Sequence, residues 1–413
     1  MPLPDPFPAS SRYTLVDSLR GFAIMGILLL HSIEHFNFYL FPDNATQSEW
    51  MVRLNGQIWA TMFFLFGGKA YGIFALLFGF TFHLQFSRRA SQGVDFGPVF
   101  IWRMMILFGF GWINAILFPG EVLLLYALLG PFLFFVRHLE NRVLLAVAIL
   151  FLLQPLEIYQ FLQSFLNAEY NKFDFGVDAL WGQTFDYIQQ GTLIALITHC
   201  WTGFKATFFW SLENGRIEQT VGLFVLGVWL GRTHGFGSGR NPHLRWLVTF
   251  GVSCAMFLGI LAVEKGWIPS LDTSYRATLK TLMVVWKNLF QIGVMVSLFC
   301  LLYALGWFQW MTAPLRAYGR MSLTNYMMQS VFGGLAFYPY GMGLAEKMNT
   351  LHSLLLGLGM FVLYLGFCNS WFLLFKFKQG PLEKIWHTLT WLPLKKRRMI
   401  PPEPEGSTPG AGQ

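Results

Sequence analysis

The chain has 413 residues, of which 54% are hydrophobic, 18% are aromatic and only 12% are charged. A water-soluble fold of this size needs more charge on its surface, and apolar runs of about 18 residues or more, each long enough to cross a bilayer, recur along the chain. The net charge of +8 comes from basic residues near the ends of these runs. Because no nucleic-acid-binding module accompanies that charge, nucleic acid is not expected as a partner. The composition predicts an all-α, polytopic membrane protein.

The cysteines and the N-terminus add little that is specific to a function. Cys200, Cys254, Cys300 and Cys368 form no CxxC pair, so we expect neither a disulfide framework nor a metal site and interpret them as buried apolar residues. The first apolar run is preceded by MPLPDPFPASSRYTL, which lacks the charged-then-apolar order of a signal peptide. We therefore expect this run to remain as the first helix.

The apolar runs predict a transmembrane bundle of about ten helices. In chain order, the expected spans are residues 19–41, 69–86, 98–118, 121–136, 143–162, 217–230, 246–263, 282–305, 321–340 and 352–375. Most lysine and arginine residues then fall on the side of the N-terminus, which places both termini in the cytoplasm. The helical domain is expected to occupy residues 19–394. A cytoplasmic segment, 1–18, precedes it, and a basic, then disordered tail, 395–413, follows it.

Residues 163–216 are expected to form a long outer loop. Within this loop, residues 192–210 are apolar enough to be an eleventh span. Such a span would move Arg232, Arg240 and Arg245 outside, against the charge rule. We therefore predict an interfacial or half-inserted helix here, and the short apolar segment 54–66 poses the same question.

The first predicted helix, VDSLRGFAIMGILLLHSIEHFNF, contains Asp17, Arg20, His31, Glu34 and His35. Eleven residues are close to three helical turns, so the arginine and the first histidine share a face about 16 Å apart along the axis. Ionisable groups at membrane depth are costly and usually face the protein interior or a water-filled cavity. The arginine could simply pair with the aspartate, and the histidines could make interhelical hydrogen bonds. A histidine beside a carboxylate can also act as a general base.

A lysine opens the second predicted span, in the sequence FGGKAYGIFALLFG. Lys69 lies between small residues that allow helices to approach closely. Its ammonium could extend outward to the membrane surface, or it could neutralise a carboxylate or a substrate within the bundle.

The segment RMMILFGFGWINAILFPGEVLLLYALLG contributes Arg103, Asn114, Glu121 and Tyr126. The arginine begins a span on the inner side, and Pro-Gly makes a tight outer turn before the glutamate. That glutamate suits a helix N-terminus, so capping is one interpretation. It is also expected at the depth of His31.

The ninth predicted span carries a polar stripe in the sequence LRAYGRMSLTNYMMQS. Ser322, Asn325 and Gln329 follow one another at helical steps, after Arg316 and Arg320 at the inner end. The stripe indicates either helix–helix hydrogen bonding or contact with a substrate.

These segments together resemble the uncharacterised YeiB family of bacterial membrane proteins. The resemblance extends over nearly the whole chain and is most specific at GRMSLTNYMMQS and QGPLEKIWHTLTW. It implies an integral protein of the bacterial inner membrane. The chain departs from the family pattern at His31, where YeiB-type proteins often carry asparagine, and at Glu121, where aspartate is more usual.

The first helix also resembles the opening helix of membrane acyltransferases of the O-antigen acetylase and heparan glucosaminide acetyltransferase type. The shared features are Asp17, Arg20 with Gly21, and His31 eleven residues after the arginine. Those enzymes move an acyl group from cytoplasmic acyl-CoA to an acceptor, often a sugar hydroxyl or amine. The resemblance therefore implies acyl-CoA as a co-substrate and a sugar or lipid-linked acceptor, with membrane lipids as surroundings and no metal.

The leading hypothesis is an acyl-CoA-dependent membrane acyltransferase. The guanidinium groups of arginine suit phosphate oxygens. The expected acyl-CoA-binding residues are therefore Arg20, Arg103 and Arg320, together with Asp17 as the partner of Arg20. His31, aided by Glu34 and His35, would deprotonate the acceptor or accept the acyl group, while Lys69 and Glu121 fix the acceptor or stabilise an oxyanion. The expected substrate contacts are Asn114, Tyr126, Asn325 and Gln329. Two alternatives stay open: a transporter or exporter of a small polar or lipid-linked solute, and a non-catalytic structural membrane protein.

Overall fold

The protein is an all-α helical bundle, as the sequence predicts. The computed structural model describes residues 14–34, 36, 39–167, 170–237, 241–266, 273–375 and 379–399, and this part of the chain contains no β-strand. The helices are α1 (Thr14–Ile33), α2 (Glu49–Phe66), α3 (Ala70–Ala90), α4 (Phe96–Leu117), α5 (Val122–Leu129), α6 (Phe132–Val136), α7 (Asn141–Leu152), α8 (Pro155–Leu166), α9 (Val177–Gln189), α10 (Leu193–Glu213), α11 (Arg216–Arg232), α12 (Pro242–Gly266), α13 (Thr273–Leu302), α14 (Gly306–Met311), α15 (Ala313–Arg320), α16 (Ser322–Phe337), α17 (Thr350–Leu374) and α18 (Pro381–Met399), with short 3-10 turns at Asn44–Thr46 and Ala345–Lys347.

Within the described residues, six helical segments are long and apolar enough to cross a membrane. They are Thr14–Ile33, Glu49–Ala90, Phe96–Leu117, Pro242–Gly266, Tyr275–Leu302 and Thr350–Leu374. A seventh results if α7 and α8, bent by 44° at their junction, count as one span. These helices show that the chain is an integral membrane protein.

Each of the ten predicted spans overlaps a helix, but four of them fall on short or divided helices, and one of these, 143–162, is divided into α7 and α8. The range 121–136 is divided into α5 and α6 at Gly130 and Pro131, whereas α11 has 17 residues and α16 has 16. At 1.5 Å per residue, α11 and α16 each reach about 25 Å, less than the roughly 30 Å of a hydrocarbon core. The expected number of ten therefore exceeds the number of helices that could each span a bilayer alone.

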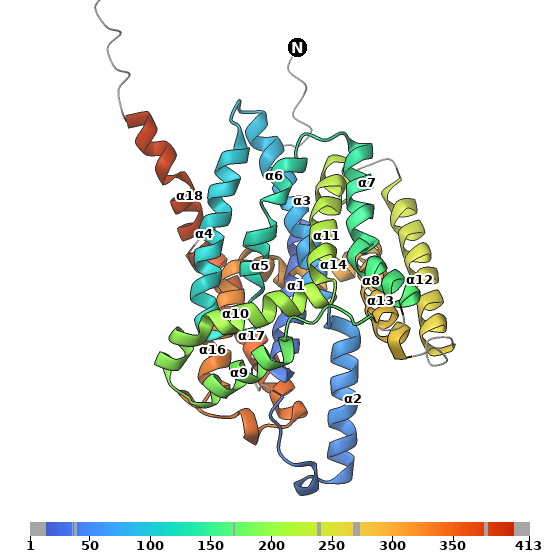
Figure 1. Ribbon diagram of the computed structural model, residues 1–413. Helices are drawn as coiled ribbons and strands as arrows, with labels where there is room; N and C mark the ends of the chain where they lie inside the picture. The colour runs from blue at the N-terminus through green and yellow to red at the C-terminus, as the bar shows by residue number, and fades with distance from the viewer. Residues whose placement is uncertain are drawn as a thin grey trace, which may run out of the picture.

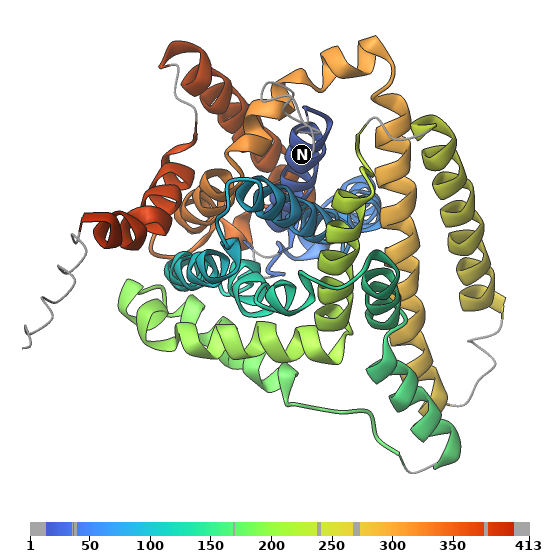
Figure 2. The same ribbon diagram turned by 90° about the horizontal axis from the view of Figure 1, so that it is seen from above.

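The segment 163–216 is largely helical rather than a loop. It contains the end of α8, all of α9 and α10, and the beginning of α11. Helix α10 lies across the long helices in both views of the bundle (Figures 1 and 2) and is not among the candidate spans. This orientation agrees with the interfacial or half-inserted helix predicted for residues 192–210. The segment 54–66 belongs to α2, which continues through a short break into α3.

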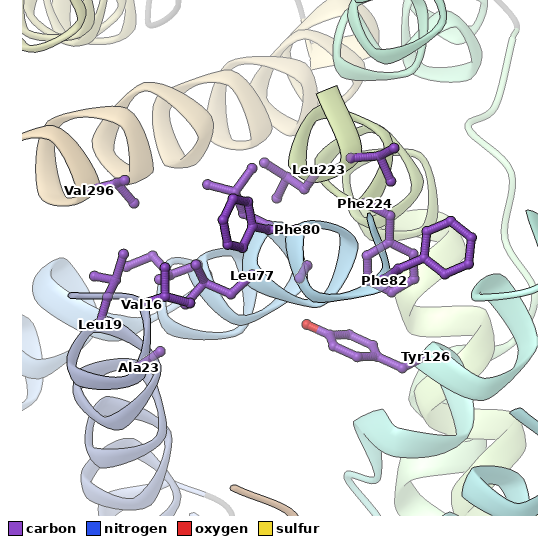
Figure 3. Packing of buried hydrophobic residues seen from close by; sticks show 14 of the residues in the cluster. Val16, Leu19, Ala23, Leu77, Phe80, Phe82, Tyr126, Leu223, Phe224 and Val296 are labelled. Carbon is purple, nitrogen blue, oxygen red and sulfur yellow. The ribbon is translucent and has the colours of Figure 1, made fainter. Parts of the chain in front are cut away.

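Helix α3 lies at the centre of the core. Its Leu77 and Phe80 pack among residues of α1, α11 and α13 (Figure 3). Glycines allow the closest approach: a Cβ on Gly79 would lie 1.9 Å from the Phe224 carbonyl oxygen, and one on Gly227 would lie 2.1 Å from that of Leu76. Because α3 and α11 touch through their backbones, the bundle holds its central helices in fixed positions.

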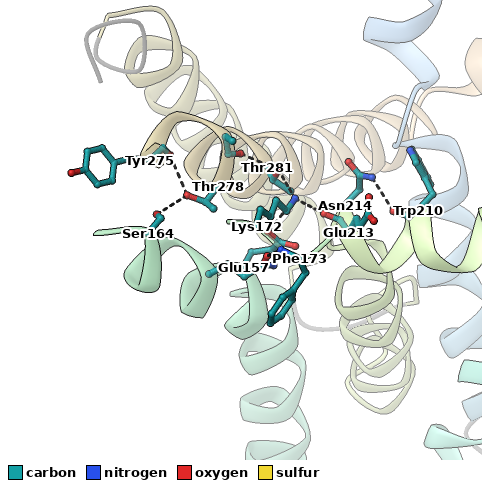
Figure 4. A network of polar contacts seen from close by, with 12 residues as sticks. Glu157, Ser164, Lys172, Phe173, Trp210, Glu213, Asn214, Tyr275, Thr278 and Thr281 are labelled. Atoms are coloured by element: carbon teal, nitrogen blue, oxygen red, sulfur yellow. Dashed lines mark hydrogen bonds and ion pairs between the residues drawn. The ribbon is translucent and has the colours of Figure 1, made fainter. Parts of the chain in front are cut away.

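The extended segment before α9 is fastened to the bundle by one lysine. Lys172 Nζ donates to the Glu213 carbonyl at 2.5 Å and to Thr281 Oγ1 at 2.9 Å, and it lies 3.8 Å from the fully buried Glu157 carboxylate (Figure 4). The Phe173 amide also donates to Gln160 Oε1 at 3.1 Å. These contacts join α8, α10 and α13, and α9 and α10 form a cover along one side of the bundle (Figure 2).

Candidate functional site

Five arginines line a cavity of about 650 Å³ in the half of the bundle where α1 begins, and we call it the arginine cavity. The five are Arg20, Arg88, Arg89, Arg103 and Arg320. They come from α1, α3, α4 and α15, and α18 closes the side with Trp386, His387 and Trp391. Glu383 is the only carboxylate that lines the cavity among the described residues. The surroundings therefore favour a ligand with several negative charges.

The arginine side chains are held by specific neighbours. Arg20 donates to Asp17 Oδ1 at 3.1 Å and to Thr81 Oγ1 at 2.8 Å. The guanidinium of Arg103 stacks 4.1 Å from the centre of the Trp386 ring. Stacking on an aromatic face and pairing with a short side chain both fix the planar guanidinium in the cavity wall.

Helix α18 is attached to α16 by a buried carboxylate. Glu383 accepts hydrogen bonds from the amides of Leu323 at 2.8 Å and Thr324 at 3.0 Å, and from Thr324 Oγ1 at 2.6 Å. Burial raises the pKa of this carboxyl, whereas the hydrogen bonds from Thr324 and Leu323 oppose that rise. The two most specific family-like sequences, GRMSLTNYMMQS and QGPLEKIWHTLTW, thus meet at one helix N-terminus.

A second cavity of about 650 Å³ lies in the other half of the bundle, and we call it the histidine cavity. His31, Glu34 and Lys69 all line it. The other polar or charged side chains in its lining are Tyr39, Tyr71, Tyr126, Asp178, Thr207, Ser211, Arg216, Lys287, Asn288 and Tyr326. Helices α9 and α10 supply part of its wall, so the cover described above encloses this site.

The two cavities share one wall. Phe74, Leu123, Tyr126 and Tyr326 line both. The His31 ring is centred 6.5 Å from the Tyr326 ring and 4.7 Å from that of Phe118. We call the four shared residues the partition. His31 therefore lies beside the partition, on the side away from the arginines.

Within the histidine cavity, Glu34 and Lys69 have identified neighbours. Glu34 Oε1 accepts a hydrogen bond from the Tyr39 hydroxyl at 2.7 Å. Lys69, 6% exposed, donates to the Phe63 carbonyl at 3.1 Å. His35, the other histidine expected here, lies outside the described residues.

Asn114 and Glu121 lie behind the partition and do not line either cavity. Both are fully buried, and Asn114 Nδ2 donates to Glu121 Oε2 while Glu121 Oε1 accepts from the Leu123 amide. The glutamate is therefore the N-cap of α5, the capping role that was one of its two interpretations. The next amide, that of Val122, donates to the Tyr326 hydroxyl at 3.3 Å, so the cap supports the partition.

The polar stripe of α16 is divided between different surroundings. Ser322 lines the arginine cavity. Asn325 Nδ2 donates to the Tyr318 carbonyl at 2.9 Å, and Gln329 is fully buried with no hydrogen-bond partner among the described residues. Neither amide lines a described cavity, so Asn325 fits the helix–helix interpretation. Tyr126, by contrast, lines both cavities and donates to the Tyr71 carbonyl at 2.7 Å.

Sequence reasoning missed three residues of the histidine cavity: Arg216, Lys287 and Asn288. Arg216 begins a helix, and its charge was interpreted only in terms of orientation. Lys287 and Asn288 lie inside an apolar run of α13, where an ionisable residue at membrane depth is itself a signal of function. Nothing local in the sequence indicates that these residues face Lys69.

The comparisons with known proteins point to one group. Residues 230–393 match the family model "Protein of unknown function (DUF418)". The chain is 25% identical to the uncharacterised protein YxaH of Bacillus subtilis, over 95% of this chain and 98% of that protein. It is 27% identical to the uncharacterised protein YeiB of Escherichia coli, over 92% of this chain and 96% of that protein.

A protein of Bacillus acidopullulyticus, described as an uncharacterised 39.9 kDa protein in the amylase 3′ region, is 24% identical over 94% of this chain and 96% of its own length. No solved structure matches the chain. The similarity to these relatives extends over both cavities, since it covers nearly all of the helical bundle. The chain is therefore similar to the YeiB-type proteins over nearly its whole length, and its residues 230–393 match the DUF418 family model.

Proposed function

We propose that the protein is an acyltransferase of the bacterial inner membrane, which moves an acyl group from acyl-CoA to a hydroxyl or amine acceptor. The observation that carries this proposal is the shared wall between a cavity lined by five arginines and a cavity lined by His31. A transferase with two chemically different substrates needs two compartments that meet at the reacting atoms. In this proposal the partition residues would lie at that meeting point.

The acyl donor would occupy the arginine cavity. Coenzyme A carries several phosphate charges, and guanidinium groups bind phosphate oxygens in a bidentate manner. Arg103 and Arg89, stacked on Trp386 and Trp391 at 4.1 and 4.3 Å, are preorganised for such contacts. The thioester end would then point toward Tyr126 and Tyr326 of the partition.

The acceptor would occupy the histidine cavity with its nucleophile at His31. For a hydroxyl acceptor, the imidazole removes the hydroxyl proton while the oxygen forms a bond to the thioester carbonyl carbon. The carbon–sulfur bond then breaks, and the leaving thiolate takes the proton from the imidazolium. The products are an acyl ester and the free thiol of coenzyme A. Glu34, one turn after His31 on the same cavity wall, supports the positive charge of the imidazolium.

A transporter of a small polar or lipid-linked solute is the second candidate, because two cavities stacked along the bundle axis could be two ends of one path. The partition between them favours the transferase. A purely structural role is the third candidate. It would leave Arg20, His31 and Lys69 privately paired and away from cavities, whereas each of them lines one.

Incubation of the purified protein with radiolabelled acetyl-CoA and a membrane lipid extract tests the proposal. We expect protein-dependent transfer of label to an acceptor, or slow release of free coenzyme A, and loss of both in His31→Gln. A transport assay with the same extract reconstituted in vesicles tests the alternative. Absence of transfer and of hydrolysis, together with solute movement, would contradict the acyltransferase proposal.

A further inference from the structure

The histidine cavity gathers three cationic side chains from three helical segments. Lys69 precedes α3, Arg216 begins α11, and Lys287 lies within α13. Lys287 Nζ is paired with the Glu264 carboxylate at 2.5 Å. Lys69 and Arg216 have no ion pair with any described carboxylate, and their recorded hydrogen bonds go to neutral groups. This end of the cavity therefore has an excess of positive charge.

The sequence of the α2–α3 junction brings these groups close together. Gly68 has φ +77°, and a Cβ placed on it would lie 2.7 Å from Asn288 Nδ2 and 2.8 Å from Arg216 Nη1. Glycine is therefore required at this position for two reasons. It adopts the left-handed backbone conformation without strain, and its lack of a Cβ leaves room for the amide and the guanidinium. An N–H-rich corner results, in which Arg216 and Asn288 lie directly beside the residue that precedes Lys69.

Beside these cations and the polar residues named above, the cavity also has an apolar wall. Ile27 and Leu30 of α1, Phe63 and Phe66 of α2, and Val284 of α13 all contribute to it. The next residue after Phe63, Phe64, is 54% exposed on the outside of the bundle, so this wall adjoins a surface suited to lipid. A ligand that matches the cationic corner and this apolar wall together has an anionic head and a hydrocarbon body.

From this arrangement we infer that Lys69, Arg216 and Asn288, with Lys287 beside them, bind the phosphate group of a lipid in the histidine cavity. A phosphate offers several oxygens to a guanidinium fork and an ammonium, and the apolar wall receives the acyl chains. The inference rests on the proposed function only in naming this lipid as the acceptor. Binding of the lipid phosphate is a separate property that needs no acyl donor.

Equilibrium binding to the full-length purified protein in an uncharged detergent tests this site without any acyl donor. The probe is dioctanoyl phosphatidic acid, compared with dioctanoyl glycerol and with inorganic phosphate. We expect the phosphatidic acid to bind at least about tenfold more tightly than either comparison ligand, a difference of about 1.4 kcal/mol or more. Inorganic phosphate binding as tightly as the lipid would overturn the lipid assignment, and dioctanoyl glycerol doing so would overturn the phosphate assignment.

Matched variants locate the site. Lys69→Met and Arg216→Gln should each weaken phosphatidic acid binding at least about tenfold, and Lys69→Arg should restore most of it. Lys280→Met on the exposed side of α13 and Arg53→Gln on exposed α2 serve as charge-loss controls. Thermal unfolding of each variant confirms that it is folded. Unchanged binding in folded Lys69→Met and Arg216→Gln would overturn the inference, whereas intact binding without acyl transfer would contradict only the proposed function.

Discussion

Gly319 of α15 lies against the backbone of α1 at Gly21: a Cβ on Gly319 would be 2.6 Å from the Gly21 nitrogen and 2.0 Å from the Asp17 carbonyl oxygen. Gly21 lies equally close to the backbone of α15, because a Cβ on Gly21 would be 2.3 Å from the Leu315 carbonyl oxygen. The residues adjoining these glycines are Arg20 and Arg320, which both line the arginine cavity. The backbone contact therefore brings two arginines from opposite ends of the chain to one site.

Replacing Gly319 by alanine should separate α1 from α15. The added methyl group has no space, so we expect a loss of about 1–3 kcal/mol of stability and weaker binding of the acyl donor. Thermal unfolding in detergent measures the first effect. Gly366→Ala in α17, where a Cβ would meet nothing within 4 Å, is the control. Equal stability of the two variants would show that the close approach is not required.

Replacing Arg103 by glutamine should impair donor binding more than the chemical step. The loss of one charge-assisted contact to phosphate is expected to raise KM for acyl-CoA about tenfold, with a smaller effect on kcat. Steady-state kinetics with varied acyl-CoA separate the two. Arg142→Gln removes an exposed arginine outside the cavity and should leave KM unchanged. A fall in kcat alone would argue against a phosphate contact.

Replacing His31 by glutamine should remove the proton transfer while keeping the cavity filled. General base catalysis contributes about 10²–10⁴-fold, so we expect a loss of that order in kcat with little change in KM. His243→Gln, at an exposed position of α12, is the matched control. Retention of more than half of the activity in His31→Gln would exclude this histidine as the base.

Replacing Glu383 by glutamine should loosen α18 from the start of α16. Three hydrogen bonds end on this carboxylate, and weakening them is expected to cost about 1–3 kcal/mol. Protease cleavage within the loosened α18 should become faster. Donor binding should become weaker, because α18 carries Trp386 and Trp391, which stack on the arginines of the cavity. Glu346→Gln, at an exposed turn, controls for loss of a carboxylate. Unchanged proteolysis would show that α18 is held by other contacts.

Replacing Lys172 by methionine should leave the carboxylate of Glu157 buried without its cation. Because Lys172 is partly exposed and its Nζ lies 3.8 Å from the carboxylate, we expect a loss of about 1–3 kcal/mol and a lower unfolding temperature. Glu157→Gln in the same chain should recover part of the loss, because the uncompensated charge is removed. If the double variant is no more stable than Lys172→Met, the two residues do not act as a pair.

Several features of the protein follow from local sequence alone. The apolar runs specify helices because each is long and uninterrupted, and the helical period places Arg20 and His31 on one face of α1. The structure agrees: one lines the arginine cavity and the other the histidine cavity. The sequence also indicated the capping role of Glu121 as one interpretation, because a carboxylate that follows Pro-Gly at the start of an apolar run suits a helix N-terminus.

Other features depend on which helices touch. For Asn325 and Gln329 the sequence left open substrate contact and helix–helix hydrogen bonding; Asn325 bonds Tyr318 of α15 and Cys368 of α17, whereas Gln329 is fully buried. Six or seven helices of the described residues are candidate spans by length and composition, against the ten spans expected, because hydropathy does not show where a helix breaks, as at Gly130 and Pro131. The docking of α18 beside the arginines was not expected, since Glu383 meets Thr324 only after the chain has folded.

The sequence by itself determined the membrane-embedded helical class and two layers of polar residues, an inner one with Arg20, Arg103 and Arg320 and an outer one with His31, Lys69 and Glu121, because both depend on composition and on the spacing within single helices. Only the tertiary structure decided that these layers are cavities with a common wall, and that Arg216, Lys287 and Asn288 join Lys69. The physical reason is that helix positions are set by contacts between distant segments, such as Gly21 with Gly319 and Gly79 with Phe224. Such contacts have no signature in the residues on either side of them.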